Sequence, residues 1–271
     1  MNKISKESIS IIIPILQGSS FIDKLISKIK KQTLLPSEII IVDSLSNDKT
    51  REIAKELGVK VFKQEFLGDG PQKKLASTFA TNDWIFSLDA DERLEDDLID
   101  YINSINIKKN TFDSYSFRRR NYCGSKWIKA ASFYPDRVTR LYNRRLVNYH
   151  PSTSHSYVDA KSILDLNYHI RHYTYNSYKD WIDKINFYST QSAKTLHVNG
   201  IKRSRIRPVT HALFAFFKKL FIKGGILQGL DGFTVALTTM FNTYMKYIKL
   251  NELYDNKADP SKHFPSKDLD D

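Results

Sequence analysis

The sequence predicts an α/β fold with one mostly parallel sheet, helices on both faces and a helical C-terminal extension. In the first hundred residues, short apolar runs alternate with segments of helical periodicity. This alternation is typical of β-α-β units, in which helices cover a parallel sheet. The C-terminal third consists instead of basic amphipathic stretches. We therefore expect a catalytic domain over residues 1–175, a helical extension over 176–254 and a polar tail over 255–271.

The first two units follow directly from the apolar pattern. Residues 10–16 are expected to form a strand, and Ser20 with Asp23 makes a capping-box start for a helix over 21–29. Residues 38–42 form the second predicted strand, which ends at Asp43. The next helix is expected to run to Leu57 from a cap at residue 46 or 47, and Gly58 is suited to a left-handed C-terminal cap.

Two further strands complete the predicted sheet. Residues 59–62 form the third, and a turn at 68–71, with the sequence GDGP, then opens a helix over 72–80. Residues 84–88 form the fourth strand. Because the carboxyl ends of parallel strands line one crevice, we expect ligands to bind at that edge of the sheet.

Composition limits the classes of protein that remain. The 271 residues are 41% hydrophobic, which predicts an ordered chain with a sizeable core. The single cysteine, Cys123, excludes a disulfide framework and fits a reducing compartment. The N-terminal apolar run IIIPIL is too short for a signal peptide, so we expect a cytoplasmic protein. A net charge of +12 predicts attraction to polyanions such as anionic lipids, phosphorylated glycans or nucleic acid.

Carboxylates follow two of the predicted strands. Asp43 ends the second strand, and Asp89 and Asp91 follow the fourth in the segment WIFSLDADERL. Two such carboxylates offer hard oxygen ligands to Mg²⁺ or Mn²⁺, with a diphosphate completing the shell. The acids that come next are expected to be a solvated turn and the first turn of a helix, where the helix dipole favours them: Glu92, Glu95, Asp96 and Asp97.

Several motifs in order resemble one enzyme family. They are SIIIPI, IIIVDSLSNDKTREIAKELGVKVF, GDGPQKKLASTFATNDWIFSLDADERL, RRRNYCGSKWI, YPDRVTRLYNRR and HYTY. Together they resemble the inverting family 2 glycosyltransferases over roughly residues 8–250. Within that family they are similar to the lipopolysaccharide-core subgroup that adds β-linked glucose to inner-core heptose. The resemblance implies a GT-A-like fold, a UDP-sugar donor and a lipid-linked glycan acceptor.

The resemblance also implies roles for individual positions. Pro14, Asp43, Gln72, Lys73 and Asp89 would surround the nucleotide, with Asp43 facing the uracil or ribose. Asp91 would hold the metal, and His172 in RHYTY would supplement that site. The structural alternatives are that Asp43 caps a turn, that Lys73 lies on a solvated helix face and that His172 has a packing role.

The catalytic base is the point at which the sequence departs from the subgroup. A base must take the proton from the acceptor hydroxyl as it attacks the anomeric carbon. The subgroup carries His-Glu after the YPD strand, whereas this chain has His155 followed by Ser156. Asp136 in YPDRV and His155 are the two leading candidates, and Asp159 is the third.

Two basic regions predict contacts with anions. Residues 201–250 carry nine Lys and Arg against one acid, Asp231, and residues 212–223 form a basic amphipathic helix typical of proteins that lie on an anionic membrane. An ordinary helix packed on the catalytic domain is the alternative. The resemblance favours a peripheral protein on the inner leaflet of the inner membrane. Arginines within residues 115–145 are candidates for binding acceptor phosphates.

Two other functions compete with this interpretation. Transfer to a polyprenyl phosphate uses the same fold, although such enzymes often have spanning helices that this chain lacks. A basic nucleic-acid-binding protein would explain the charge, but the sequence has no helix-turn-helix, zinc-finger or RNP signature. Acids at strand ends would also repel phosphates unless a cation intervened. We therefore expect no nucleic-acid partner.

Overall fold

The computed structural model describes residues 9–32, 36–105, 111–151 and 156–258. The chain divides into two compact units. The first unit comprises Met1–Asn121 and Pro135–Thr174, and the second comprises Tyr122–Tyr134 and Tyr175–Asp271. A segment of the expected catalytic domain, Tyr122–Tyr134, therefore groups with the helices.

The first unit is built on four parallel strands, as the apolar runs predict. They are β1 (Ile9–Ile15), β2 (Pro36–Asp43), β3 (Lys60–Lys63) and β4 (Trp84–Ser87). Their spatial order is β3-β2-β1-β4, with every neighbouring pair parallel. The carboxyl ends of β1, β2 and β4 consequently meet at one edge.

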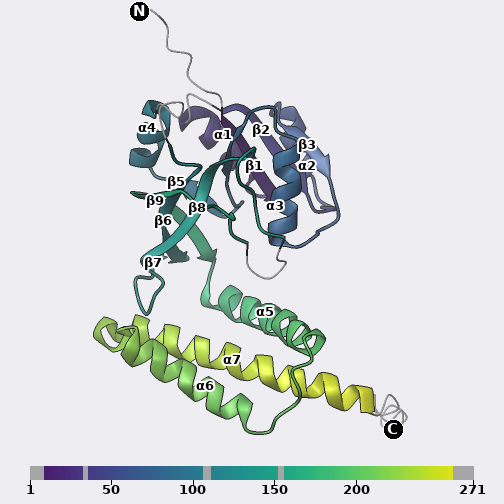
Figure 1. The fold of residues 1–271 in the computed structure, drawn as a ribbon, viewed down its shortest axis with the longest axis vertical. Helices are drawn as coiled ribbons and strands as arrows, with labels where there is room; N and C mark the ends of the chain where they lie inside the picture. Colours follow the sequence, from purple (N-terminus) through teal and green to yellow (C-terminus); the bar gives the residue numbers. More distant parts are fainter. Residues whose placement is uncertain (1–8, 33–35, 106–110, 152–155, 259–271) are drawn as a thin grey trace, which may run out of the picture. The chain divides into compact units, whose positions relative to one another are not determined.

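Helices cover both faces of these strands (Figure 1). Helices α1 (Ile22–Gln32), α2 (Thr50–Glu56) and α4 (Asp96–Ser104) share a core with alternate residues of β1 such as Ile11 and Ile13. On the other face, α3 (Asp69–Thr78) packs Ala76 into a core that contains Ile12. The two-residue period of the strand thus assigns successive isoleucines to opposite cores.

The sheet continues beyond β4 with antiparallel strands. These are β8 (Asp136–Asn143), β6 (Ser114–Cys123), β9 (Ile163–Tyr175) and β5 (Glu92–Leu94). They extend the order as β4-β8-β6-β9-β5. The pairing of β5 with β9 places Glu92 opposite His172. The sheet is therefore mixed, and this pairing brings a late segment of the chain next to the DAD motif.

Two helix starts differ from the sequence prediction. Helix α2 begins at Thr50, and its N-cap position is Lys49. Neither Ser46 nor Asn47 caps it, because the Ser46 hydroxyl and the Asn47 side chain instead accept hydrogen bonds from Gln17 in the loop after β1. Helix α3 begins at Asp69. The left-handed conformation expected at Gly58 is confirmed, with φ of 69°.

The second unit is helical. It also contains the two-stranded pairing of the end of β6 with β7 (Lys126–Trp127). Its helices are α5 (Tyr178–Val198), α6 (Arg207–Phe217) and α7 (Gly229–Ala258), and a π-helical turn η2 (Lys218–Ile222) and a 3₁₀ turn η3 (Gly225–Gln228) join the last two. Trp181, Ile185 and Val235 form its core with residues of the segment 123–131.

The stretch 212–223 is helical almost throughout, because α6 continues without a break from Phe217 into the π-helical turn that ends at Ile222. In the described part of the chain, no single helix is long and apolar enough to cross a membrane. The bent pair Arg207–Ile222 and Gly225–Asp255, with 66° between its halves, passes that test only when taken together.

Candidate functional site

The first turn of α3 connects the ends of two strands. Gln72 is fully buried, accepts a hydrogen bond from the Leu67 amide (3.3 Å) and donates one to the Ser44 hydroxyl (3.2 Å) after β2. Lys73 is also buried, and its ammonium lies 2.7 Å from Asp89 Oδ1 after β4. Adjacent residues of one helix thus hold the two strand ends that the sequence predicts as the site. Lys73 does not lie on a solvated helix face.

Asp43 at the end of β2 is a buried carboxylate with one open oxygen. Its Oδ2 accepts hydrogen bonds from the Arg51 guanidinium (3.0 Å) and from the Ser46 amide (3.0 Å). No side chain or backbone group in the described part of the chain donates to Oδ1, although this atom is buried. A buried acceptor without a donor is costly, so it suits a ligand that supplies an N–H or O–H.

Asp89 is held between two cations. Its Oδ1 pairs with Lys73 (2.7 Å), and its Oδ2 pairs with the buried guanidinium of Arg140. Burial alone would raise the pKa of Asp89, but Arg140 and Lys73 bring the pKa well below its usual range. Asp89 is therefore ionised at neutral pH. A ribose hydroxyl would reach this carboxylate only alongside these two partners, since each oxygen accepts more than one hydrogen bond.

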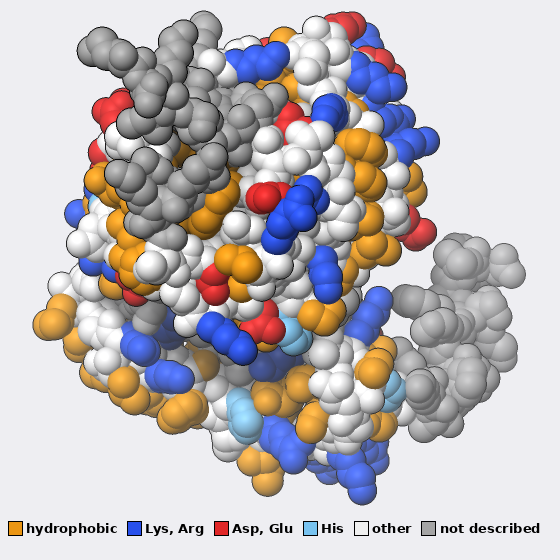
Figure 2. All heavy atoms as spheres, turned by 45° about the horizontal axis from the view of Figure 1, so that its top comes forward, with side chains coloured by type: hydrophobic (Ala, Val, Ile, Leu, Met, Phe, Trp, Pro, Cys, Tyr) orange, Lys and Arg blue, Asp and Glu red, His pale blue; other side chains and the backbone are white. Residues whose placement is uncertain are grey.

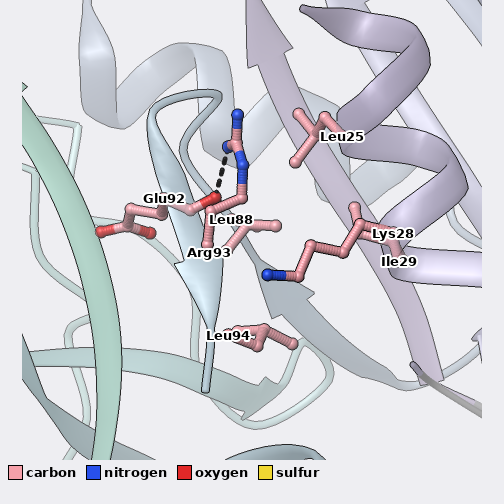
Figure 3. A pocket seen from close by; sticks show the side chains of 7 residues that line it. All are labelled: Leu25, Lys28, Ile29, Leu88, Glu92, Arg93 and Leu94. Atoms are coloured by element: carbon pink, nitrogen blue, oxygen red, sulfur yellow. Dashed lines mark hydrogen bonds between the residues drawn. The ribbon is translucent and has the colours of Figure 1, made fainter. Parts of the chain in front are cut away.

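Glu92 contradicts the sequence expectation of a solvated turn. It is fully buried, lies 2.5 Å from Arg140 Nη2, and accepts a hydrogen bond from the Asp89 amide (3.1 Å). In Figure 3, the Glu92 and Arg93 side chains leave β5 in different directions. Glu92, Arg93 and Leu94 border a cavity of only about 10 Å³, which has room for about one water molecule.

Asp96 and Asp97 do lie in the first turn of a helix, α4, as the sequence predicts. Glu95 precedes them at the N-cap position, and its carboxylate pairs with Arg120 (2.7 Å) and Arg171 (3.0 Å). The acids that follow the DAD motif therefore divide into a buried ion-pair group and a solvated helix turn.

Asp91 lies next to His172. The distance from Asp91 Oδ2 to His172 Nε2 is 3.4 Å, and the Asp91 side chain is 43% exposed. His172 Nδ1 lies 2.7 Å from Asn121 Oδ1, which is an acceptor only. This contact favours the tautomer with the proton on Nδ1. The lone pair of Nε2 then faces the Asp91 carboxylate, as in the common arrangement of a metal-ligating histidine.

Mg²⁺ and Mn²⁺ are bound in proteins mainly by oxygen ligands, and Mn²⁺ also accepts imidazole. Within residues 9–32, 36–105, 111–151 and 156–258, no group of three or more His, Cys, Asp or Glu side chains is placed to hold a metal ion. Asp91 and His172 therefore supply one carboxylate and one imidazole. Metals that act on nucleotides are usually held by one or two protein ligands, with water and phosphate oxygens completing the shell. The two residues fit such a site.

Asp136 belongs to the same cluster. At the start of β8, its Oδ2 accepts hydrogen bonds from Arg119 Nε (2.9 Å) and from Asn121 Nδ2 (3.1 Å). Asn121 thus connects Asp136 to His172, and Arg119 also lies 3.5 Å from Glu92. The structure therefore brings together Asp136, Asp91, His172, Asp89 and Lys73.

The remaining candidate bases lie around the segment after β8. His155 falls outside the described residues. Its neighbour Ser156 donates a hydrogen bond to Asp69 Oδ2 and lies 3.4 Å from Lys73 Nζ, so this segment adjoins the first turn of α3. Asp159 is exposed, and its backbone amide bonds to Asn148.

Pro14 is the last predicted site residue, and it pairs with Val42 near the end of β1. The loop that follows β1 and the loop that follows β2 each contain a non-glycine residue with positive φ, Gln17 at 55° and Leu45 at 65°. Backbone in this region is strained and tends to occur at functional sites. Both residues lie at the edge where Asp43 ends its strand.

Sequence reasoning missed Glu92 as part of the site, and it counted Arg140 only among the arginines that could bind acceptor phosphates. Both side chains are buried and form an ion pair with each other. Arg140 also pairs with the Asp89 carboxylate, and Glu92 accepts a hydrogen bond from the Asp89 amide. The only signal was the position of Arg140 immediately before two apolar residues of a strand, which hints at an inward charge. Arginines expected to meet acceptor phosphates are also engaged within the chain, since Arg119, Arg120, Arg137 and Arg145 pair with carboxylates.

The chain matches a known protein family and several curated relatives. The model of "Glycosyl transferase family 2" matches residues 10–178. An uncharacterized glycosyltransferase of Rickettsia bellii is 34% identical over 270 residues, which are 93% of this chain and 89% of the relative. The lipopolysaccharide core biosynthesis glycosyltransferase LpsC of Rhizobium meliloti is 23% identical, covering 95% of this chain and 97% of its own length.

A solved structure shows the same architecture. It is the mannosyltransferase PcManGT from Pyrobaculum calidifontis in complex with GDP-Man and Mn²⁺. The TM-score is 0.54 at 12% identity, and the alignment covers 93% of this chain and 88% of that chain. The fold of the present chain is therefore GT-A-like, with a helical C-terminal extension, as the sequence predicts.

Proposed function

The chain belongs to glycosyl transferase family 2, and from this premise we propose that it transfers a hexose, with inversion, from a nucleotide sugar to a sugar of a lipid-linked glycan. The observation that carries the proposal is the pairing of Asp91 with His172 at the edge of the sheet where Asp43 presents an open oxygen. UDP-glucose is the proposed donor. A sugar of a lipopolysaccharide inner core is the proposed acceptor, and the relative LpsC is named for lipopolysaccharide core biosynthesis.

Asp43 would orient the nucleotide. Its buried Oδ1 would accept the imino N–H of uracil, while Arg51 and the Ser46 amide keep the carboxylate in place through Oδ2. Gln72 would act indirectly, because its amide holds the loops at Ser44 and Leu67. Pro14 would border the pocket from β1.

Asp91 and His172 would hold Mg²⁺ or Mn²⁺, which supplies positive charge beside the donor diphosphate when bound. The solved mannosyltransferase contains Mn²⁺ together with its donor, which supports this choice of cations. Lys73 and Arg140 compensate Asp89, so this carboxylate adds little net negative charge near the phosphates. Asn121 would keep His172 Nε2 directed towards Asp91.

The acceptor hydroxyl must lose its proton on the face opposite the leaving nucleotide. Asp136 is the proposed base because it lies one hydrogen-bonded residue, Asn121, away from His172. Its pairing with Arg119 holds the carboxylate in one position. His155 and Asp159 are the alternatives, and alanine at Asp136 is expected to reduce transfer at least as much as alanine at His155.

The test is the substitution Asp91→Asn, assayed with UDP-glucose and other UDP-, GDP- and ADP-sugars in the presence of Mn²⁺. Loss of one charged metal ligand is expected to reduce transfer and donor hydrolysis about a hundredfold or more. The fold is expected to persist, because the side chain is 43% exposed and the hydrogen bond of its backbone carbonyl with Tyr173 remains.

Asp100→Asn is the matched control, because this exposed carboxylate lies on α4 away from the pair. It is expected to retain the activity of the unmodified protein. If Asp91→Asn transfers sugar at a near-normal rate from the same donor, the assignment of the metal ligand is wrong. If no nucleotide sugar is consumed by the unmodified protein, the proposed function itself is wrong.

A further inference from the structure

The junction of α6 and α7 exposes large apolar side chains. We call residues 217–233 the hairpin tip. Within it the exposed fractions are 87% for Leu227, 78% for Leu230, 71% for Ile222 and 54% for Ile226. Phe217 and Phe221 stack on each other with ring centroids 5.8 Å apart and are each 52% exposed. So much contiguous apolar surface is unusual for a face that meets only water.

The backbone of the hairpin tip is fixed by glycines. Gly224 and Gly229 have positive φ, 67° and 57°. Gly225 and Gly232 pack backbone against backbone, and a Cβ atom on Gly232 would lie 1.8 Å from the Gly225 carbonyl oxygen. Lys219 donates a hydrogen bond to the Ala131 carbonyl (2.9 Å) and thereby ties the tip to the core of the second unit. The exposed side chains are therefore presented by an ordered turn.

The apolar surface continues along both helices from the hairpin tip. On α7 exposed residues recur every three or four positions, at Leu237, Phe241, Tyr244 and Ile248. On α6 the corresponding exposed residues are Val209, Leu213 and Phe214. In the lower part of Figure 2, orange side chains alternate with blue ones over these helices. Each helix has an amphipathic pattern whose apolar side is in part uncovered.

The charges around the hairpin tip are basic. Lys218 and Lys223 are exposed within it. The one acid between residues 207 and 251 is Asp231, whose carboxylate pairs with Lys126 at 2.6 Å. This ion pair removes the negative charge that would oppose an anionic surface. Two like-charged tips would repel each other, so the charge favours an anionic partner over a second copy of the chain.

We propose that the hairpin tip inserts Leu227, Leu230 and Ile222 into the interfacial layer of an anionic lipid bilayer, while Lys218 and Lys223 contact lipid headgroups. Such binding combines burial of apolar side chains with electrostatic attraction, and it leaves the protein lying on the membrane. The inference locates the contact at the junction of the helices, which includes the C-terminal part of the stretch 212–223. It does not depend on the transfer reaction, because binding is measured without donor.

The test is sedimentation of the full chain with vesicles of phosphatidylethanolamine and phosphatidylglycerol, compared with phosphatidylcholine vesicles. We expect binding to the anionic vesicles that weakens as NaCl is raised from about 0.1 M to about 0.5 M, because salt screens the lysines. The double variant Leu227→Ser with Leu230→Ser is expected to bind at least about tenfold more weakly. The double variant Lys218→Gln with Lys223→Gln is expected to weaken binding about tenfold or more and to reduce the salt dependence.

The matched controls are Leu146→Ser with Val198→Ser, and Lys24→Gln with Lys161→Gln. The apolar control residues are 67% and 83% exposed, and both lysines are exposed. Both controls are expected to bind like the unmodified protein, and circular dichroism verifies that each variant is folded. Absence of binding to anionic vesicles would overturn the proposal, and so would unchanged binding of the leucine variant. A dimer in solution that the leucine substitutions dissociate would assign this surface to a second copy.

Discussion

At the scale of single residues, the orientation of His172 depends on Asn121. The side-chain oxygen of Asn121 lies 2.7 Å from His172 Nδ1, and its amide nitrogen donates to Asp136 (3.1 Å). The second contact determines which end of the amide faces the histidine. Because outer partners of this kind fix the tautomer and the ring orientation of a ligating histidine, they affect metal affinity without touching the metal.

We predict that Asn121→Ala weakens Mn²⁺ binding in the presence of UDP about tenfold to a hundredfold. The measurement is calorimetric titration of Mn²⁺ into the protein with UDP, so it requires no turnover. Asn167→Ala is the control, since Asn167 is an exposed residue of β9 that contacts Arg137. Equal Mn²⁺ affinity in the unmodified protein and Asn121→Ala would show that His172 is not held for a metal by this contact.

The residues of the site were predictable to the extent that they follow strands. Asp43, Asp89 and Asp91 come directly after predicted strands, and the structure places them at the same edge of the sheet. Glu92 and Arg140 were not predictable in the same way, because Glu92 is buried only when β5 pairs with β9. A local pattern of acids does not reveal a pairing partner about eighty residues away.

At the scale of elements, Glu38 holds the parallel strands together at their N-terminal end. Its carboxylate accepts hydrogen bonds from Ser10 of β1 (2.5 Å), from Lys60 of β3 (2.6 Å) and from the Thr81 hydroxyl before β4 (2.8 Å). Burial alone would raise the pKa of Glu38, but these hydrogen bonds lower it from 4.5 to about 2. One side chain of β2 thus ties together the four strands that carry the site.

We predict that Glu38→Gln lowers the free energy of unfolding by about 1–3 kcal/mol at pH 7. Because the folded-state pKa is depressed, the stabilisation is fully present above about pH 4.5 and is lost as the pH falls towards 2. Urea unfolding followed by circular dichroism at pH 7 and at pH 3 measures the difference between the two proteins. The difference in the free energy of unfolding should be smaller at pH 3 than at pH 7.

Glu56→Gln, at the exposed end of α2, serves as the comparison. Its effect is expected to be close to zero at both pH values. A Glu38→Gln difference that is the same at pH 7 and pH 3 would contradict the assigned role of the ionised carboxylate.

The elements of the first ninety residues were predictable because each strand has a continuous apolar run and each helix an apolar stripe. The structure confirms the four parallel strands and the helices between them. Prediction was poorer at the junction that follows α6. Residues 212–222 are helical, as their apolar spacing predicts, but the spacing does not reveal that residues 218–222 are π-helical or that Gly225 and Gly232 approach each other closely in the turn to α7.

At the scale of the whole molecule, the basic residues behind the net charge of +12 have different surroundings in the two units. In the first unit, arginines and lysines such as Arg119, Arg140 and Lys73 neutralise the carboxylates of the site. In the second unit, Lys218 and Lys223 are exposed beside apolar residues. The overall charge is therefore no guide to nucleic-acid binding, and the acids at the strand ends determine which anions the first unit accepts.

This distribution leads to a prediction for the intact protein. UDP with Mn²⁺ is expected to raise the midpoint of thermal unfolding, because a ligand that binds only the folded state stabilises it by mass action. At a ligand concentration about a hundredfold above Kd, the stabilisation is about 2.7 kcal/mol, which corresponds to about 5–10 °C for a protein of this size. UDP alone should have a much smaller effect, because the Asp91 carboxylate repels a diphosphate that has no cation.

The measurement is a thermal-shift assay in which UDP with Mn²⁺, UDP alone, Mn²⁺ alone and a single-stranded oligonucleotide are compared at the same ionic strength. The Asp91→Asn variant is expected to lose the part of the shift that requires Mn²⁺, whereas Asp100→Asn should keep it. Stabilisation by the oligonucleotide without metal, and none by UDP with Mn²⁺, would assign the positive charge to nucleic-acid binding. A metal-dependent shift instead requires a nucleotide site in the first unit, because a bare polyanion site would gain affinity from the net charge alone and would not need the cation.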